Sequence, residues 1–342
     1  MMFKIPPTPV ADWVALSDHT GPIIAGGISD VVQSGSFILE LAAPRQGGAV
    51  LLDYQSDVGW PRAFSIFHDA ELGIVIRHRQ GGAAQRLQLP GPLPRDWGLA
   101  RLTYSWDGPA RVWSMRLEDA AGAWAFATMG LNPVPMAGQD ILALCTAQNN
   151  VRRDAAVQWF GVSLQTPSSA PKTWIGSYTP VETLQGRVAA GDLRPGDMVA
   201  TLDHGHQPLR TLHKTNLPNR GRFAPVLLRA PYYARQSDIL VAPAQLTLLS
   251  GVLVEYLFGE DAVLAPAAAL RDGNSALSDV RRPVSACVSL DLGGAELIIA
   301  DGCPLLCTSG LAGPALPYRV LEDYEVLPLQ SVLGRTGQST AA

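Results

Sequence analysis

Two hydroxyl side chains near the middle of the chain, Ser177 and Thr179, lie two residues apart in the string Ser-Tyr-Thr-Pro. A hydroxyl is a weak nucleophile at neutral pH, so either one needs a base beside it. The nearest histidines along the chain, His204 and His206, stand in a stretch of Gly, Asp and Pro that is typical of an exposed turn, and no histidine follows His213. We therefore interpret both as solvated loop residues rather than as partners of the hydroxyls.

Cysteines and paired carboxylates give weaker patterns. Cys303 and Cys307 are spaced for a metal or a disulfide, but no histidine follows and no second cysteine pair exists, so we interpret the four cysteines as buried thiols. Glu260 and Asp261 are adjacent, and neighbours on a strand point to opposite faces, so a turn is favoured over a catalytic pair. A glycosidase would need two carboxylates facing each other roughly 5 to 10 Å apart, and no such signature is present. The sequence predicts no metal and no cofactor.

Short apolar runs joined by Gly, Pro and Asp turns surround the two hydroxyls. The series opens at 174–180, continues through Leu-Arg-Pro-Gly-Asp within 191–199, and ends at 254–264. Adjacent Pro195 and Gly196 signal a reverse turn, from which an apolar strand leaves. The order of these blocks resembles the Hint fold, the β module of Hedgehog autoprocessing domains and inteins, and in particular the bacterial Hint proteins. The resemblance covers roughly residues 174–330.

This resemblance assigns roles to five positions. The family usually has Cys in a Cys-Phe-Thr-Pro-like string, where this chain has Ser177 and, two residues on, Thr179. The family has a catalytic His in a Val-Ser-Pro-Gln-His-like string, where this chain has Gln245. A third block, His-Glu running to Ala-Asp-Gly, here begins with Ala295 and ends at Asp301. The implied site is therefore degenerate at the nucleophile and at both His positions.

Two interpretations of the degenerate site remain open. Gln has no pKa near neutrality and relays no proton, and positioned acid–base catalysis is worth about 100- to 10,000-fold. We therefore expect a Hint fold that has lost autoprocessing and acts as a binding or structural module. The alternative is slow self-cleavage or ester formation at Gly176-Ser177, with Ser177 or Thr179 as nucleophile.

The first 165 residues predict an all-β domain of eight or more short strands. The clearest element is a hairpin around Asp107-Gly108, because an Asp-Gly turn joins two runs in which apolar and polar residues alternate. The apolar members of these runs are Leu102, Tyr104, Trp106, Trp113, Met115 and Leu117. Further strands are expected at 123–129, 140–146 and 157–164.

The strand rhythm and this hairpin weakly resemble concanavalin-like and laminin-G-like jelly rolls, which implies recognition of a carbohydrate or a protein surface. Six of the eight tryptophans precede residue 125. Tryptophan rings stack on sugars but also fill cores. Burial in the core is favoured for any one of them. Trp60 and Trp97, beside Pro61 and Asp96 in loop-like sequence, are the better candidates for exposure and for ligand binding.

The sequence as a whole predicts an all-β protein with an N-terminal jelly-roll-like β-sandwich and a C-terminal Hint β fold. The expected boundaries are 1–165 for the lectin-like sandwich, 166–173 for a Pro-containing linker, 174–330 for the Hint domain and 331–342 for a flexible tail. Residues 1–15 are expected to be irregular, with β structure from Gly35. A single helix is expected at 318–327.

The composition limits which kinds of partner and which cellular compartment we expect. The chain has 342 residues, a net charge of −4 with dispersed basic residues, and only 16% charged residues, which does not indicate a nucleic-acid surface. Two prolines interrupt the N-terminus where a signal peptide needs an apolar run, and no 18-residue apolar run is present. We expect a cytoplasmic protein, with secretion by a signal-less route left open. A glycan or a protein partner is expected, and the sequence does not predict the oligomeric state.

Overall fold

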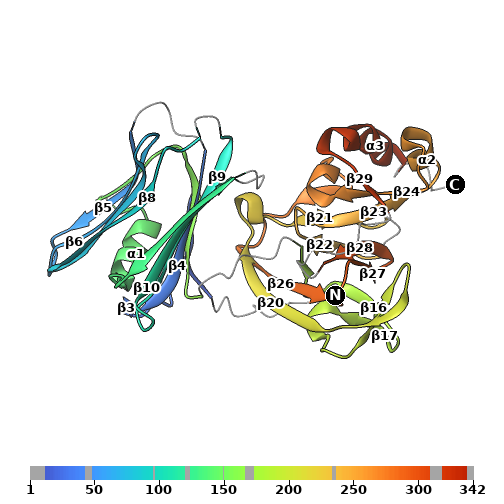
Figure 1. The fold of residues 1–342 in the computed structure, drawn as a ribbon, viewed down its shortest axis with the longest axis horizontal. Helices are drawn as coiled ribbons and strands as arrows, with labels where there is room; N and C mark the ends of the chain where they lie inside the picture. Colours follow the sequence, from blue (N-terminus) through green and yellow to red (C-terminus); the bar gives the residue numbers. More distant parts are fainter. Residues whose placement is uncertain are drawn as a thin grey trace, which may run out of the picture. The chain divides into compact units, whose positions relative to one another are not determined.

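The computed structural model describes residues 12–42, 48–94, 97–119, 124–148, 150–165, 173–232, 236–308 and 318–336. The chain separates into two compact units, Met1–Ser168 and Ser169–Ala342 (Figure 1). Most of the predicted linker, together with the predicted lead-in up to residue 11, lies outside the described residues. Each unit is described below by itself.

The N-terminal unit is built on two antiparallel sheets. The larger has the order β11 (Ala125–Leu131), β10 (Val112–Asp119), β9 (Leu99–Asp107), β4 (Ser34–Ala42), β14 (Val157–Ser163), β1 (Trp13–Asp18) and β2 (Gly21–Ala25). The smaller has the order β13 (Val151–Arg153), β5 (Ala49–Ser56), β6 (Arg62–Asp69), β7 (Gly73–Gln80) and β8 (Ala83–Pro90). A two-stranded ladder of β3 (Val31–Val32) and β12 (Met136–Ala137) precedes helix α1 (Gly138–Cys145).

Aromatic side chains join the inner faces of these two sheets. The ring centroid of Phe37 on β4 lies 5.2 Å from that of Phe64 on β6 and 5.3 Å from that of Phe160 on β14. All three are buried in one hydrophobic cluster with residues of both sheets. The packing of two antiparallel sheets over a shared core is a β-sandwich.

The predicted hairpin is confirmed. Strands β9 and β10 pair with Trp106 opposite Trp113, and the turn between them spans residues 108–111. Tyr104 and Met115, a facing pair, are fully buried. Alternation over a short range therefore predicted the buried face of this hairpin.

Other expectations for the N-terminal unit are wrong. Residues 140–146 are not a strand, because Gly138–Cys145 is helix α1. A short apolar run does not distinguish a buried strand from a buried helix by its periodicity. The β structure also begins earlier than Gly35, at Trp13 in β1.

The C-terminal unit contains two further sheets. The first has the order β20 (Thr211–Pro218), β26 (Val284–Asp291), β15 (Ile175–Gly176), β22 (Ile239–Val241), β21 (Val226–Leu228) and β25 (Ala276–Ser278). The second has the order β17 (Gly186–Ala189), β16 (Pro180–Thr183), β18 (Met198–Thr201), β27 (Glu296–Ala300), β28 (Cys303–Cys307), β23 (Leu246–Ser250), β24 (Ala262–Pro266) and β29 (Arg319–Val320), with β19 (Gly205–Pro208) also paired to β18.

Short helices complete this unit. They are the 3₁₀ turns η1 (Ala190–Asp192), η2 (Gly221–Phe223) and η4 (Ala267–Leu270) and the helices α2 (Val252–Phe258) and α3 (Asp323–Thr336). Helix α2 was not predicted. It ends at Phe258 and is capped by Gly259, whose φ of +69° is the left-handed conformation that glycine favours. The adjacent Glu260 and Asp261 lie in the bend at 259–261, as the predicted turn requires.

The end of the chain also differs from expectation. The predicted helix at 318–327 is β29 followed by α3, and α3 reaches Thr336, well into the predicted tail. Residues 337–342 lie outside the described residues. Despite the helices, both units are dominated by antiparallel strands, so the all-β class is confirmed.

Candidate functional site

Ser177 follows directly on β15, a two-residue strand between two longer neighbours. Ile175 pairs with Val241 on β22 and with Val288 on β26, and Gly176 pairs with Cys287. The backbone N–H of Ser177 continues this ladder by donating to the carbonyl of Ala286 at 2.9 Å. The peptide bond between Gly176 and Ser177 is therefore held in the middle of a sheet.

A tight turn then reverses the chain. The N–H of Thr179 donates to the carbonyl of Gly176 at 2.9 Å, and Thr179 is buried. The 3₁₀ turn η1 closes over it, since Ala190 donates to the carbonyl of Thr179 at 2.8 Å and Gly191 donates to that of Ser177 at 2.7 Å. A Cβ on Gly191 would lie 3.0 Å from the Cβ of Ser177, so only glycine fits here without displacement.

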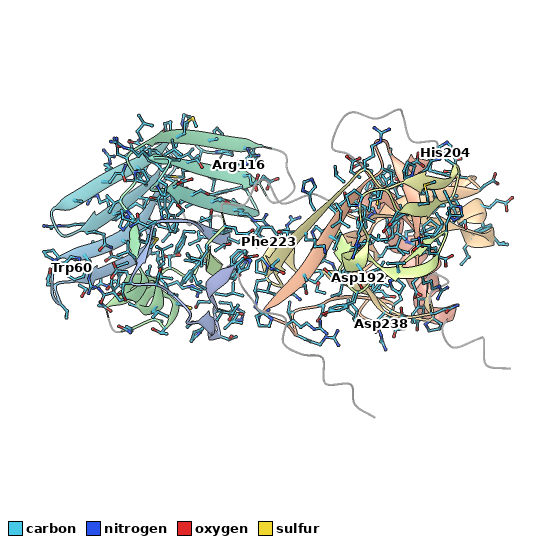
Figure 2. The ribbon with its side chains drawn as sticks, turned by 90° about the horizontal axis from the view of Figure 1, so that it is seen from below. Trp60, Arg116, Asp192, His204, Phe223 and Asp238 are labelled. Atoms are coloured by element: carbon cyan, nitrogen blue, oxygen red, sulfur yellow. The ribbon has the colours of Figure 1, made fainter. Side chains whose placement is uncertain are left out.

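The side chain of Ser177 is half-buried. Within the described part of the chain, no hydrogen bond joins it to another group. His204 instead contacts Glu296, with 2.9 Å between Nδ1 and Oε2, and this hydrogen bond raises the pKa of the exposed imidazole. Figure 2 shows His204 well apart from Asp192, the last residue of η1. His206 is exposed on β19, as expected of a solvated residue.

Gln245 has a structural role. Its side chain is 1% exposed, and Nε2 donates to the carbonyl of Leu306 at 2.6 Å and to that of Leu246 at 3.3 Å. Its backbone carbonyl accepts from Ala267 at 2.8 Å. The side-chain amide of Gln245 thus connects the start of β23 to β28. Its N–H groups already donate to backbone carbonyls.

Ala295 lies at the turn before β27 and has no chemical function. Its methyl group is partly buried against a small apolar cluster of Leu264, Leu297 and Leu306. A His at this position would have to displace these contacts. The adjacent Glu296 is the residue that contacts His204.

Asp301 is the charged member of the predicted site, and it organises backbone. One carboxylate oxygen accepts from the N–H of Ser237 at 2.6 Å, from its hydroxyl at 2.9 Å and from the N–H of Gln236 at 3.0 Å. The Arg187 guanidinium donates to the other oxygen at 3.4 Å. Burial acts to raise the pKa of Asp301, but these donors outweigh burial, so its pKa lies below the usual value.

The four cysteines are all free and buried. Burial raises the pKa of Cys307 to about 12 and that of Cys287 further, so neither supplies a thiolate at neutral pH. No cluster of metal-ligating side chains occurs among the residues that the structure describes. Cys287 lies opposite Gly176 in the ladder, a proximity that the sequence did not predict.

Ser289 is another neighbour of the site that sequence reasoning missed. Its hydroxyl donates to the carbonyl of Thr173 at 2.8 Å, just upstream of β15. A lone Ser in a strand carries no motif, so only the register of β26 against β15 could have identified it.

The two tryptophans proposed as ligand-binding residues differ. Trp60 is 46% exposed. The expectation for Trp97 is wrong, because Trp97 is 6% exposed, stacks on His68 at 5.8 Å and lies 5.4 Å from the Trp124 ring. Its loop-like sequence context did not reveal these distant partners.

Among the described helices, none combines the length and the apolar character needed to cross a membrane.

Comparisons with known proteins agree with the C-terminal architecture. The family model described as "Hint domain" matches residues 177–307, which confirms the resemblance expected from the sequence blocks. The MchDnaB-1 intein is similar, with 19% identity, 40% of this chain and 99% of that chain covered, and a TM-score of 0.25. No curated protein matches the chain.

Two further solved structures are similar to this chain. A sialidase CBM40 of Ruminococcus gnavus, bound to sialyllactose, has 11% identity and a TM-score of 0.31, with 47% of this chain and 90% of that chain covered. The LG1–3 region of the laminin α2 chain has 11% identity and a TM-score of 0.27, with 84% of this chain and 48% of that chain covered.

Proposed function

We propose that this Hint-domain protein does not process itself and that its Hint domain serves as a structural or binding module. The observation that supports this most is the hydroxyl of Ser177, which has no hydrogen-bonded base among the described residues. The one side chain at a family His position that could hydrogen-bond, Gln245, already donates to the carbonyl of Leu306.

The size of the chemical deficit supports the same proposal. A serine hydroxyl needs a base to become nucleophilic, and an amide cannot accept and return a proton. General acid–base catalysis contributes about 100- to 10,000-fold, and this contribution is missing in addition to the loss of the more nucleophilic thiolate. The fixed backbone around Gly176 and Ser177 therefore lacks the groups that would move protons.

The alternative function is slow self-cleavage at Gly176-Ser177. The Ser177 Oγ would attack the Gly176 carbonyl carbon, the C–N bond would break, and the hydroxyl proton would pass to the new amino group, leaving an ester. The contact that favours this alternative is the N–H of Thr179, which donates to the Gly176 carbonyl at 2.9 Å and polarises it.

Incubation of the full chain with hydroxylamine separates the two functions, because hydroxylamine cuts an ester and leaves the amide intact. We expect the 36.4 kDa chain to persist in mass spectrometry, in parallel with a Ser177→Ala control. A fragment that ends at Gly176 in the wild type and is absent from Ser177→Ala would contradict the proposal and establish the ester-forming alternative.

We further propose that the N-terminal unit recognises a carbohydrate or a protein surface. The exposed ring of Trp60 supports this proposal, since a large aromatic side chain at the surface of a sandwich is a common recognition element. A glycan array probed with the full chain tests the carbohydrate case. Silence across the array would leave a protein partner as the recognised surface.

A further inference from the structure

A cleft of about 440 Å³ lies beside Trp60 in the N-terminal unit. It lies where the β3–β12 ladder and the start of α1 meet the end of β7 and the residues before β6. Apart from Trp60, its walls are apolar at Val31, Pro135 and Ala137 and polar at Asp30, Gln80 and Gln139. Figure 2 shows Trp60 at the margin of this unit. Of its lining residues, the sequence singled out Trp60 alone.

The exposed Trp60 ring is held in place by two contacts. Its indole N–H donates to Oε1 of Gln80 at 3.4 Å. The guanidinium carbon of Arg62 lies 5.0 Å from the ring centroid, a cation–π contact. A surface tryptophan with both contacts has a defined orientation before any ligand arrives.

Behind the ring, a buried carboxylate anchors both partners of Trp60. Asp140 is 1% exposed, accepts from Nε2 of Gln80 at 2.6 Å and lies 3.5 Å from Nε of Arg62. It also accepts from the hydroxyl of Tyr54 at 2.8 Å. Arg62 is itself 5% exposed, so a charge pair is buried directly beneath the ring.

Burying an ion pair is weak support for stability, since apolar side chains of similar volume would often serve as well. Here the pair fixes two residues that position an exposed ring, which is the arrangement of a preorganised binding site. An exposed anchor aromatic beside a cleft is also typical of recognition hot spots. The cleft is therefore the place in the N-terminal unit where recognition is best supported.

The chemistry of the walls selects the ligand. Among the described residues that line the cleft, the one charged side chain is the exposed carboxylate of Asp30, which repels an anion. A cation is disfavoured on the Trp60 ring because Arg62 already places a positive charge over it. The side chains of Gln139 and Asp30 are exposed and offer amide and carboxylate groups to hydroxyls.

We propose that this cleft binds a neutral saccharide. The apolar face of one sugar ring stacks on Trp60, and its hydroxyl groups donate to the carboxylate of Asp30 and bond with the amide of Gln139. The proposal rests on the recognition function proposed above for the N-terminal unit and specifies its site and ligand class.

Isothermal titration calorimetry of the full chain tests it, with lactose, maltose, cellobiose and N,N′-diacetylchitobiose as neutral probes, 3′-sialyllactose as the anionic probe and choline as the cationic one. We expect at least one neutral saccharide to bind. Trp60→Ala should then weaken binding about 30-fold, the effect of a hot-spot residue. Trp60→Phe should retain part of the affinity, and Gln139→Ala should weaken it less than Trp60→Ala does.

Met129→Ala is the matched control, because Met129 is a large side chain of the same unit that is 76% exposed on β11 and does not line the cleft. It should leave binding unchanged. A saccharide that binds Trp60→Ala as well as wild type would overturn this site and leave the recognition function standing. Trp60-dependent binding of sialyllactose or choline alone would overturn the ligand class. Silence with every saccharide, here and on the array, would overturn both this inference and the carbohydrate case.

Discussion

The cleft beside Trp60 and the turn at Ser177 use buried polar groups in opposite ways. In the cleft, Asp140 and Arg62 are buried and their contacts converge on a ring that faces solvent. Among the residues of the predicted site, Gln245 and Asp301 are equally buried, but their contacts end on backbone amides and carbonyls. The first arrangement presents a side chain to a ligand, and the second holds loops and strands together.

This difference shows that the burial of a polar residue does not by itself reveal whether the residue serves ligand binding or the fold. Every buried polar group needs partners, so burial alone does not indicate function. The two regions differ in the residue at which the hydrogen bonds and ion pairs of the buried polar groups end. In the cleft this residue is Trp60, an exposed side chain, whereas at Gln245 and Asp301 the contacts end on backbone groups of Leu306 and Ser237.

The strongest way to break the comparison is to remove Asp140. Asp140→Ala leaves the guanidinium of Arg62 buried without its carboxylate, and removes an acceptor from Tyr54 and Gln80. We expect a loss of about 3 to 5 kcal/mol in the free energy of unfolding of the N-terminal unit. Urea unfolding followed by tryptophan fluorescence measures it, because all the tryptophans except Trp174 belong to this unit.

Asp30→Asn is the control for this measurement. Asp30 is an exposed acid of the same unit, so its replacement should change the free energy of unfolding by less than about 0.5 kcal/mol. Equal effects of the two variants would mean that the buried carboxylate does not organise the cleft.

Removing the side chain of Gln245 should lower the free energy of unfolding by less than Asp140→Ala does. Gln245→Ala takes away the donor to the buried carbonyl of Leu306, and a buried polar group left unpaired costs about 1 to 3 kcal/mol. Hydrogen exchange in urea, read on peptides from the C-terminal unit, measures the loss. The hydroxylamine result should stay unchanged.

Gln207→Ala is the matched control, since Gln207 also donates from Nε2 to a carbonyl, that of His204, at 2.8 Å, but at a position open to solvent. Water replaces that hydrogen bond, so the change in stability should be within about 0.5 kcal/mol. If Gln207→Ala were as damaging as Gln245→Ala, burial would not explain the role of Gln245.

The sequence predicted those parts of the fold that local chemistry determines. The Asp107-Gly108 hairpin and the order of the Hint blocks rest on turn residues and on alternation over a few positions, and both are confirmed. Helix α1 was missed because its apolar run is too short to show a period. Trp97 was misplaced because its burial depends on His68 and Trp124, which lie far from it in sequence.

The two sites were predictable only in part, for the same reason. The residues around Ser177 could be named because they follow a known order of blocks. Their partners could not, since Gln245 meets Leu306 only through the pairing of distant strands. In the cleft, Asp140 meets Gln80 and Tyr54 across 60 and 86 positions, so nothing in the local sequence connected Trp60 to a buried charge.

The finest test of the comparison is the pH dependence of the bonds to Asp301. The pKa of Asp301 is lower in the folded protein than its ordinary value of 3.8, because the donors from Ser237, Gln236 and Arg187 outweigh burial. A group with a depressed folded pKa contributes stability above its unfolded pKa, and loses that contribution as the pH falls through the folded pKa. Acid should therefore weaken the C-terminal unit below about pH 3.8.

Asp301→Asn isolates this contribution, since Asn keeps the shape and tolerates the φ of +50° at this position. We expect the variant to be about 1 kcal/mol less stable at neutral pH, because a charged acceptor becomes a neutral one. The difference should shrink towards zero in acid. The pKa of Asp272 is also depressed, because hydrogen bonds from residues 274–276 outweigh its burial, so the wild type alone cannot show the effect. Asp261→Asn, on the exposed bend after α2, is the control and should change the free energy of unfolding at neutral pH by less than about 0.5 kcal/mol. If the difference in free energy of unfolding between wild type and Asp301→Asn stayed constant from neutral to acid pH, the shape of the side chain rather than its charge would hold the loop at Ser237. The buried carboxylate of Asp301 would then stabilise its unit without its charge, unlike Asp140, whose charge pairs with Arg62.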